Sequence, residues 1–457
     1  MKVHTEGAFE ALIEAHLLAN GYRSAHHTTY DAHRALLADE LIGFIEATQP
    51  KAWGKLQALH GAKLNEMFLD WLVKDFAARG SLDVLRRGTK FHGQKIELAY
   101  FRPAHGLNPE ILERYEQNRL TVVRQVHFDP SKPDLSLDLV LFLNGIPVVT
   151  AELKNAMTGQ TIHHALRQYK KDRDPQAPIF RFKERALVHF AVDTDEARFT
   201  TKLAWDSTFF LPFNKGSRNG AGNPPVPGKH KTHYLWEEVW ERHSLLDILG
   251  RFMHLQEEEK RDLNTGKIKK SETMIFPRYH QLDCVRKLVG ASVRNGAGTS
   301  YLVQHSTGSG KSNSIAWLAH RLASLHDVND EKVFHSVIVV TDRKVLDQQL
   351  QDTIYQLDHK NGVVEKIDEN SKQLAAALKT GVPIVITTLH KFPFVTEQVG
   401  LLPDRRYAII VDEAHSSQSG EMAADMKRVL SGAKVEQELL DELDFRTWRK
   451  GTCTRWR

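Results

Sequence analysis

Two acids and a lysine stand near the ends of two neighbouring apolar runs. The stretch LDLVLFLNGIPVVTAELKN, residues 137–155, carries Asp138 near its start and Glu152 and Lys154 near its end. Burying a charge without a partner is costly, so these charges need an explanation. Two carboxylates that converge beside a lysine can hold a hard, oxygen-seeking cation such as Mg²⁺. The cation would polarise a phosphodiester and lower the pKa of a bound water, and the lysine would position that water or stabilise the developing charge.

An Asn-Gly pair between the two runs would bring the acids together. Asn144 and Gly145 predict a hairpin between two strands. Asp138 lies seven residues before Gly145 and Glu152 seven after it, so the acids face each other across a loop of odd length. A two-residue loop shifts the pairing by one and keeps them near neighbours. Glu152 and Lys154 are two residues apart, hence on one face of their strand. On spacing alone, an exposed hairpin that carries a salt bridge is the favoured alternative.

A second candidate site lies in QHSTGSGKSNSIAWLAH, residues 304–320, where a strand pattern runs into a helix. Glycines in the loop let backbone amides approach phosphate oxygens, and the helix N-terminus adds a favourable dipole. The lysine would reach the β- and γ-phosphates of ATP, and the following serine would ligate Mg²⁺. His305 replaces the first glycine of the common pattern, so a glycine-rich helix entry is the alternative. The expected nucleotide-binding residues of this loop are Thr307, Gly308, Ser309, Gly310, Lys311 and Ser312.

The stretch YAIIVDEAH, residues 407–415, supports an ATP site. A buried strand would deliver Asp412 and Glu413 at its carboxyl end, where open α/β sheets bind ligands. Asp412 can hold Mg²⁺, and Glu413 can orient and deprotonate an attacking water. An acidic turn at a strand end is the alternative, but two motifs, each on the correct element, favour nucleotide hydrolysis.

The elements that must position these residues divide the chain into two α/β parts. Helix and strand patterns alternate up to about residue 205. From about residue 275, short apolar strands alternate with helices, which predicts a parallel sheet. The charged run at 257–272 is the best linker candidate, with a surface loop as the alternative. We therefore expect a first domain at 1–256, a linker at 257–274, a second domain at 275–435 and an atypical tail at 436–457.

Composition excludes several classes of protein. Of 457 residues, 41% are hydrophobic and 26% charged, as in ordinary soluble globular proteins. No stretch approaches the roughly 20 apolar residues that span a bilayer, so no membrane partner is expected. Cys284 and Cys453 stand far apart, which argues against a disulfide framework or a zinc site and predicts a reducing, cytoplasmic location. A net charge of +5 permits an anionic partner without identifying one.

The last residues change character. FRTWRKGTCTRWR, residues 445–457, carries five basic residues, two tryptophans and no acid, and shows neither a strand nor a helix pattern. We expect a truncated chain with an out-of-register or foreign tail, and a short natural tail is the alternative.

Residues 275–430 resemble superfamily 2 helicases and translocases, which implies a RecA-like parallel α/β domain. RYHQLDCV, residues 278–285, is similar to the segment whose glutamine, here Gln281, would read the adenine edge. The stretches at 339–350 and 385–392 resemble motifs that contact the DNA backbone. In the family, a second motor lobe supplies an arginine finger, and this chain shows no counterpart of that lobe.

The first half resembles the PD-(D/E)xK nuclease core, a mixed sheet with flanking helices. The resemblance makes Asp138, Glu152 and Lys154 catalytic, with the two acids binding the metal. The helical stretch ALRQYKKDRDP, residues 165–175, offers Gln168 and Tyr169 as the glutamine-tyrosine element of the RecB-type subgroup, although the tyrosine should trail by four. That subgroup also uses a glutamate on an early helix. Our choice is Glu10, which would share one helix face with Glu6 and Glu14, and a solvated stripe is the alternative.

A RecB-like nuclease followed by a superfamily 2 motor resembles the restriction subunit of type I restriction-modification enzymes, over about residues 5–435. Local phrases such as LVLFLNGIPVVTAELKN and DEAHSSQSGEMAADMK carry this resemblance. It implies an Mg²⁺-dependent double-stranded DNA endonuclease coupled to ATP-driven translocation, in a complex with methyltransferase and specificity subunits. The alternatives are a translocase whose N-terminal domain is structural, and a chain that binds DNA or nucleotide without turnover.

Overall fold

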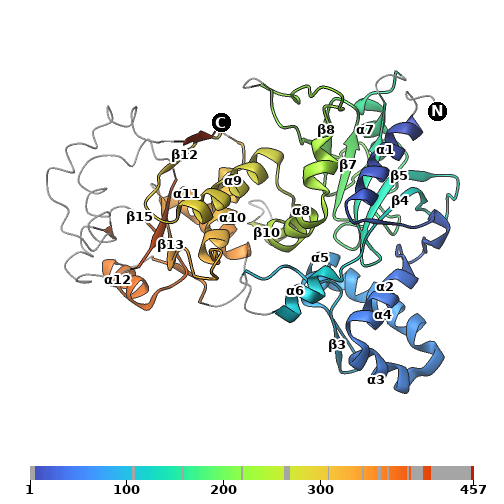
Figure 1. Cartoon of the computed structure of the whole chain (residues 1–457), viewed down its shortest axis with the longest axis horizontal. Helices are drawn as coiled ribbons and strands as arrows, with labels where there is room; N and C mark the ends of the chain where they lie inside the picture. The colour runs from blue at the N-terminus through green and yellow to red at the C-terminus, as the bar shows by residue number, and fades with distance from the viewer. Residues whose placement is uncertain are drawn as a thin grey trace. The chain divides into compact units, whose positions relative to one another are not determined.

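The computed structural model shows a mixed α/β chain with two compact units, as expected (Figure 1). One unit comprises residues 1–103 and 108–279, and the other comprises 104–107 and 280–457. The structure describes residues 6–104, 109–155, 159–217, 220–261, 268–306, 308–341, 344–357, 362–367, 370–388, 391–392, 405–412 and 454–456.

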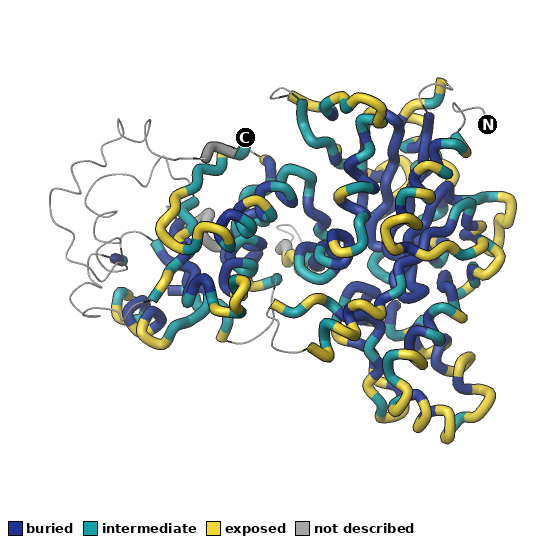
Figure 2. Tube along the Cα trace, in the orientation of Figure 1, coloured by how far each residue is buried: buried dark blue, intermediate teal, exposed yellow. Residues whose placement is uncertain are grey.

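A seven-stranded mixed sheet in the order β1-β4-β5-β6-β7-β8-β9 forms the centre of the first unit. The β1–β4 and β6–β7 pairs are parallel, and the other neighbours are antiparallel. Every residue of β6 is buried, and Ile, Val and Leu fill four of its eight positions. Figure 2 shows the central strands of this unit in the dark blue of buried residues. The strands are β1 (Arg23–Ser24), β4 (Leu120–His127), β5 (Ser136–Leu143), β6 (Ile146–Leu153), β7 (Val188–Val192), β8 (Ala197–Thr200) and β9 (Leu211–Pro212).

Helices cover this sheet. The apolar side of α7 (Ile162–Lys171) packs into a core with Val123 of β4 and Val140 of β5. The other helices of the unit are α1 (Glu6–Ala19), α2 (Ala38–Thr48), α3 (Pro50–His60), α4 (Leu64–Arg79), α5 (Ser81–Arg87), α6 (Pro109–Glu116) and α8 (Arg242–Asp247). The unit also contains the short 3-10 turns η1 (His27–Thr29) and η2 (Gly61–Lys63), the π-helical turns η4 (Leu235–Val239) and η5 (Ile248–Phe252), and the hairpin β2 (Thr89–Phe91) with β3 (Gln94–Ile96).

The predicted hairpin turn is present between β5 and β6. Asn144 and Gly145 have φ angles of 51° and 81°, the left-handed values that a two-residue turn of this kind needs. A Cβ on Gly145 would lie 2.5 Å from the carbonyl oxygen of Leu37, so close packing also requires glycine here. The predicted hairpin is therefore confirmed, and of the two loop lengths left open the structure has the two-residue loop.

A bulge corrects the register of this hairpin. Leu143 pairs with Ile146 next to the loop, but beyond the irregularity Leu139 pairs with Ala151, a shift of one residue. Continued by one position, this register places Asp138 directly opposite Glu152. The two-residue loop alone would have offset the acids, and the bulge removes the offset.

The segment 257–274 is not the linker that its charges predicted. It forms most of an antiparallel hairpin, β10 (His254–Arg261) with β11 (Ile268–Ile275), inside the first unit, and the division between units falls after Tyr279. One pair of opposite charges lies across the hairpin, the 2.9 Å ion pair between Glu259 and Lys270, whereas Glu257 stands opposite Glu272. The ends of the two strands next to the core are buried at His254 and Met274, and this packing, which the charge pattern does not reveal, holds the hairpin in the first unit.

The second unit contains the parallel sheet that the sequence predicted, in the order β14-β15-β13-β16. Helices lie on both faces. Ile338 and Val340 of β13 pack with α12, whereas Val337 and Val339 pack with α10 and α11. The strands are β13 (Ser336–Thr341), β14 (Val364–Lys366), β15 (Ile384–Thr388) and β16 (Tyr407–Val411), and the helices are α9 (Tyr279–Asn295), α10 (Lys311–Ala323), α11 (Lys344–Leu357) and α12 (Ser371–Thr380).

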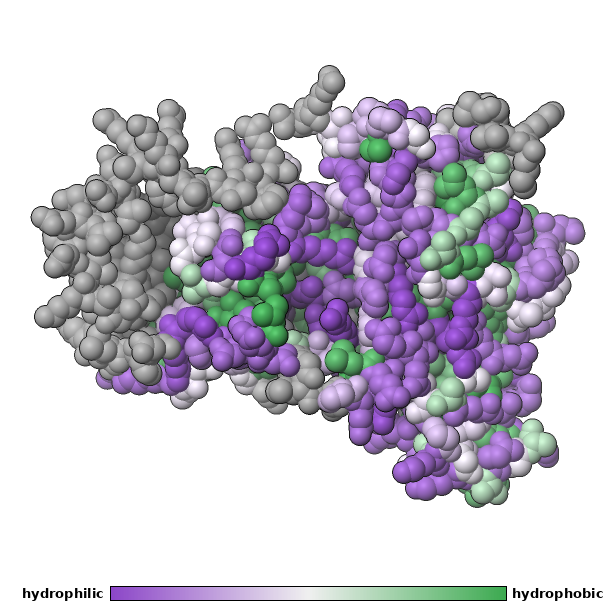
Figure 3. All heavy atoms as spheres, in the orientation of Figure 1, coloured by the Kyte–Doolittle hydropathy of each residue, from purple (hydrophilic) through white to green (hydrophobic). Residues whose placement is uncertain are grey.

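The C-terminal residues differ from their prediction at one point. We expected no strand in the tail, yet β17 (Thr454–Trp456) pairs in parallel with β12 (Tyr301–Val303). The other residues of 436–457 lie outside the described part of the chain. Within the described residues, no helix combines the length and apolarity that crossing a bilayer requires. Hydrophilic side chains cover most of the described surface on the face drawn in Figure 3.

Candidate active site

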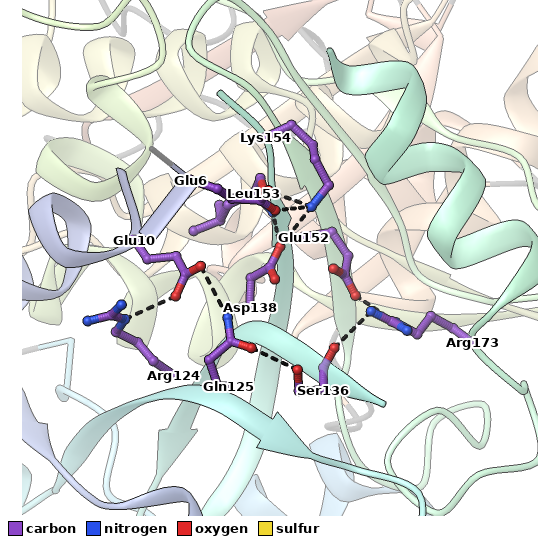
Figure 4. Close-up of polar contacts among 10 residues, drawn as sticks. All are labelled: Glu6, Glu10, Arg124, Gln125, Ser136, Asp138, Glu152, Leu153, Lys154 and Arg173. Atoms are coloured by element: carbon purple, nitrogen blue, oxygen red, sulfur yellow. Dashed lines mark hydrogen bonds and ion pairs between the residues drawn. The ribbon is translucent and has the colours of Figure 1, made fainter. Parts of the chain in front are cut away.

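The fold brings Asp138, Glu152 and Lys154 together at one end of β5 and β6 (Figure 4). Their exposed fractions are only 7%, 0% and 3%, so the alternative of an exposed hairpin is wrong. The Lys154 ammonium donates to Asp138 Oδ2 at 3.4 Å and to the Leu153 carbonyl at 3.0 Å, and it also pairs with Glu6. The backbone amide of Leu153 donates to Asp138 Oδ2 at 2.7 Å, which fixes that carboxylate against β6.

Glu152 is held by an arginine that sequence reasoning missed. Arg173, just beyond α7, donates through Nε to Glu152 Oε1 at 2.7 Å and through Nη2 to the Ser136 carbonyl at 2.8 Å. The other carboxylate oxygen, Oε2, is buried without a hydrogen-bond partner among the described residues. Arg173 stands in the charged run KKDRDP, where nothing in the sequence separates a buried cation from its solvated neighbours.

Burial raises the pKa of Glu152 to about 8, and the nearby negative charge of Asp138 adds to the rise. Arg173 and Lys154 lower that pKa by less than burial and Asp138 raise it. Burial and a neighbouring carboxylate both disfavour the charged form of an acid, which accounts for the direction of the shift.

The donor set fits Mg²⁺. The described residues contain no group of three or more His, Cys, Asp or Glu side chains suited to a metal. Mg²⁺ does not need one, because it is commonly held by one or two carboxylates, with waters and substrate phosphates completing its shell. The buried, unpartnered Oε2 of Glu152, opposite Asp138, is the kind of atom that a cation would satisfy.

The early helix contributes Glu10. This residue is 3% exposed, so a solvated stripe is wrong for it. Arg124 donates to one of its carboxylate oxygens and Gln125 to the other, each at 3.1 Å. Burial raises the pKa of Glu10, and Asp138 contributes to the rise. The other two glutamates of α1 also face inward, since Glu6 pairs with Lys154 and Glu14 with Arg124 at 3.2 Å.

The glutamine-tyrosine pair on α7 splits between two environments. Tyr169 is fully buried, and its hydroxyl shares a 2.8 Å hydrogen bond with Thr150 of β6. The side-chain oxygen of Gln168 is buried without a hydrogen-bond partner in the described chain. The tyrosine thus supports the strand that carries Glu152, and a catalytic role for Gln168 stays a prediction.

The glycine-rich loop of the second unit has the backbone that phosphate binding requires. Gly308 and Gly310 have φ angles of 74° and 82°, and the 13-residue helix α10 begins at Lys311. A Cβ on Gly310 would lie 2.5 Å from Nε2 of Gln281, the end of a flexible side chain, so it is the left-handed backbone more than space that favours glycine there. Ser309 is 7% exposed, and its hydroxyl has no hydrogen-bond partner among the described residues. A nucleotide phosphate fits this donor-rich helix entry.

The structure describes some of the other residues expected at the ATP site and leaves two of them outside the described part of the chain. Gln281 donates to the Gly310 carbonyl at 2.9 Å, so the structure places it against the loop, and its contact with adenine stays a prediction. Asp412 follows β16, and its backbone amide donates to the Val340 carbonyl at 2.9 Å. Thr307 and Glu413 lie outside the described residues. The lysine and serine of the loop, Lys311 and Ser312, begin α10 as expected.

Comparisons with known proteins found a matching family for each half of the chain. Residues 6–208 match the family of the type I restriction enzyme R protein N terminus, and residues 280–435 match the SWI2/SNF2 ATPase family. The chain is 25% identical, over 397 residues, to the putative type I restriction enzyme MjaVIIIP endonuclease subunit of Methanocaldococcus jannaschii, covering 79% of this chain and 34% of that protein. It is also 25% identical, over 323 residues, to the type I restriction enzyme HindI endonuclease subunit of Haemophilus influenzae, covering 67% of this chain and 28% of that protein.

These matches define a chain with an R-protein N-terminal region followed by an ATPase region of the RecA-like kind. The resemblance predicted from the sequence is confirmed: the chain is a relative of the R, or endonuclease, subunits of type I restriction enzymes. It spans about a third or less of the length of these two curated relatives, at 34% and 28%.

Proposed function

We propose that this chain acts as a restriction subunit, an Mg²⁺-dependent endonuclease on double-stranded DNA whose second unit binds ATP and drives translocation. The observation that carries the proposal is the buried convergence of Asp138, Glu152 and Lys154, with one Glu152 oxygen that has no hydrogen-bond partner among the described residues. The proposed partners are DNA and the methyltransferase and specificity subunits of the same system.

In the nuclease unit, Asp138 and Glu152 would hold Mg²⁺. When bound, the cation polarises the phosphodiester and lowers the pKa of a water. Lys154 lies on the Asp138 side of the site, where its ammonium would orient that water and stabilise negative charge on the phosphate. Arg173 holds the Glu152 carboxylate by one oxygen and so leaves the other directed into the site.

In the second unit, the loop and the start of α10 would bind the nucleotide phosphates. Gly308 and Gly310 present backbone amides, and Lys311 supplies positive charge at the helix N-terminus. Asp412, after β16, would hold the Mg²⁺ that accompanies ATP, and Glu413 would orient the attacking water.

A second candidate function is a translocase whose first unit is structural. The ion pairs favour it, because Glu152 bonds Arg173 and Lys154 bonds Asp138, as they would in a purely structural network. A nuclease and a structural domain differ in one respect: only the nuclease needs all three groups for DNA scission.

Nicking of supercoiled plasmid by the purified chain separates the two candidates. The chain is incubated with DNA in Mg²⁺ or in EDTA, without ATP, and compared with Glu152→Ala and with Lys311→Ala. The proposal predicts Mg²⁺-dependent nicking that Glu152→Ala abolishes and Lys311→Ala leaves intact. Nicking that survives Glu152→Ala, or a wild-type chain that does not nick, would assign the first unit a structural role.

A further inference from the structure

Strand β4 loses its regular alternation beside the candidate metal site. Val123 and Val126 belong to the same core, although residues three apart on a regular strand point to opposite faces. Arg124 and Gln125 between them both bond Glu10, the first at Oε2 and the second at Oε1, each at 3.1 Å (Figure 4). Two consecutive residues therefore hold both oxygens of one carboxylate.

The backbone of Gln125 makes this possible. Its φ of 52° lies in the left-handed region, which a non-glycine residue inside a strand seldom adopts. On either side of it, Arg124 pairs with Leu139 and Val126 with Leu137, so Gln125 stands across from the position of Asp138. Backbone strain of this kind persists where surrounding contacts enforce it, and it gathers at functional sites.

A second contact fixes the orientation of the Gln125 amide. The Ser136 hydroxyl donates to Gln125 Oε1 at 2.7 Å, so the amide nitrogen is the group that faces Glu10. The amide is neutral, so it orients the Glu10 carboxylate without cancelling its charge. Arg124 also orients that carboxylate but neutralises it, so the two donors have different effects on a cation nearby.

We propose that Gln125 is a positioning residue of the metal centre, whose strained backbone aims a neutral amide at Glu10 and holds that carboxylate beside Asp138. This inference rests on the proposed nuclease function and adds a residue that does not touch the metal. A purely structural Gln125 would stabilise the fold. A positioning Gln125 lowers the stability of the metal-free chain through its strain and raises its affinity for the metal.

The test compares melting temperature in EDTA with Mg²⁺ affinity measured by calorimetry. Gln125→Gly relieves the left-handed strain and removes the amide, so we expect an unchanged or higher melting temperature and Mg²⁺ binding about 10-fold or more weaker. Gln125→Asn tolerates the left-handed backbone but is one methylene too short to reach Glu10, so it should weaken binding to a similar extent.

His92→Gly is the matched control, because His92 has a φ of 42° in the β2–β3 turn and is no part of the site. It should raise the melting temperature and leave Mg²⁺ affinity unchanged. If the wild-type chain does not bind Mg²⁺, or if Glu152→Ala does not remove that binding, the nuclease proposal itself fails. If that binding is present but equal in Gln125→Gly, or if Gln125→Gly melts below wild type, the positioning role alone is overturned.

Discussion

Replacing Glu152 with glutamine should make the metal-free chain more stable, and increasingly so as the pH rises. The pKa of Glu152 is raised from 4.5 to about 8, first by burial and then by Asp138. Between these two values the unfolded chain releases the proton and the folded chain keeps it. Stability is therefore full below pH 4.5 and falls as the pH rises towards 8. Glutamine keeps the shape, offers Arg173 an oxygen and does not titrate.

The magnitude follows from the size of the shift. Each pKa unit corresponds to about 1.4 kcal/mol, so a rise from 4.5 to about 8 costs the wild-type chain at most about 5 kcal/mol. Urea unfolding of both proteins in EDTA, at about pH 5 and about pH 9, gives the unfolding free energy of Glu152→Gln minus that of wild type at each pH. The contributions of the other titrating groups are the same in both proteins and cancel in this difference. Mg²⁺ should reduce this difference in unfolding free energy at high pH, because a cation that binds only the folded wild-type chain stabilises that chain. A difference in unfolding free energy that is the same at both pH values would refute the reasoning.

Three further substitutions test the rest of the account. Lys154→Met should abolish plasmid nicking and leave Mg²⁺ binding by calorimetry equal or tighter, since it removes a cation beside Asp138; lost binding would contradict the assigned role. Arg173→Met should lower the unfolding free energy by about 3–5 kcal/mol above pH 8, because it leaves Glu152 buried and unpaired, and adding Glu152→Gln should restore most of that loss in urea unfolding. Lys311→Ala should abolish binding of a fluorescent ATP analogue with little change in melting temperature, and retained binding would remove the phosphate loop from the ATP site.

Local sequence signals predicted the elements that depend on neighbouring residues. The Asn-Gly turn, the apolar strands and the glycine-rich entry to α10 are each determined within a few positions, and each is present. Asp138 and Glu152 stand opposite each other because of a bulge between their strands. The sequence did not predict this bulge, because a bulge depends on packing across the sheet. The charged run at 257–274 was misjudged for a related reason, since the pairing of its two strands and the burial of His254 and Met274 at their ends depend on the folded unit and not on local composition.

The residues around the acids were the hardest to predict. Arg173 and Gln125 reach the site from a loop after α7 and from β4, far in sequence from the acids they support. Arg173 belongs to a polar segment whose composition also suits a solvated surface, and Gln125 is a polar residue in the apolar strand LTVVRQVH, where an exposed position is equally compatible with the sequence. Only the folded unit, which buries Glu152 and Glu10, makes this arginine and this glutamine the hydrogen-bond partners of the two acids.

The most direct test of the central claim is crystallographic. Crystals of the chain soaked in Mn²⁺, a stand-in for Mg²⁺ with an anomalous signal, should show a peak between Asp138 and Glu152, at roughly 2.1 Å from their oxygens. A parallel soak of Glu152→Gln should lose that peak. A soaked wild-type crystal with no peak there, and with the Glu152–Arg173 and Asp138–Lys154 pairs unchanged, would show that the cluster is a structural ion-pair network and not a metal centre.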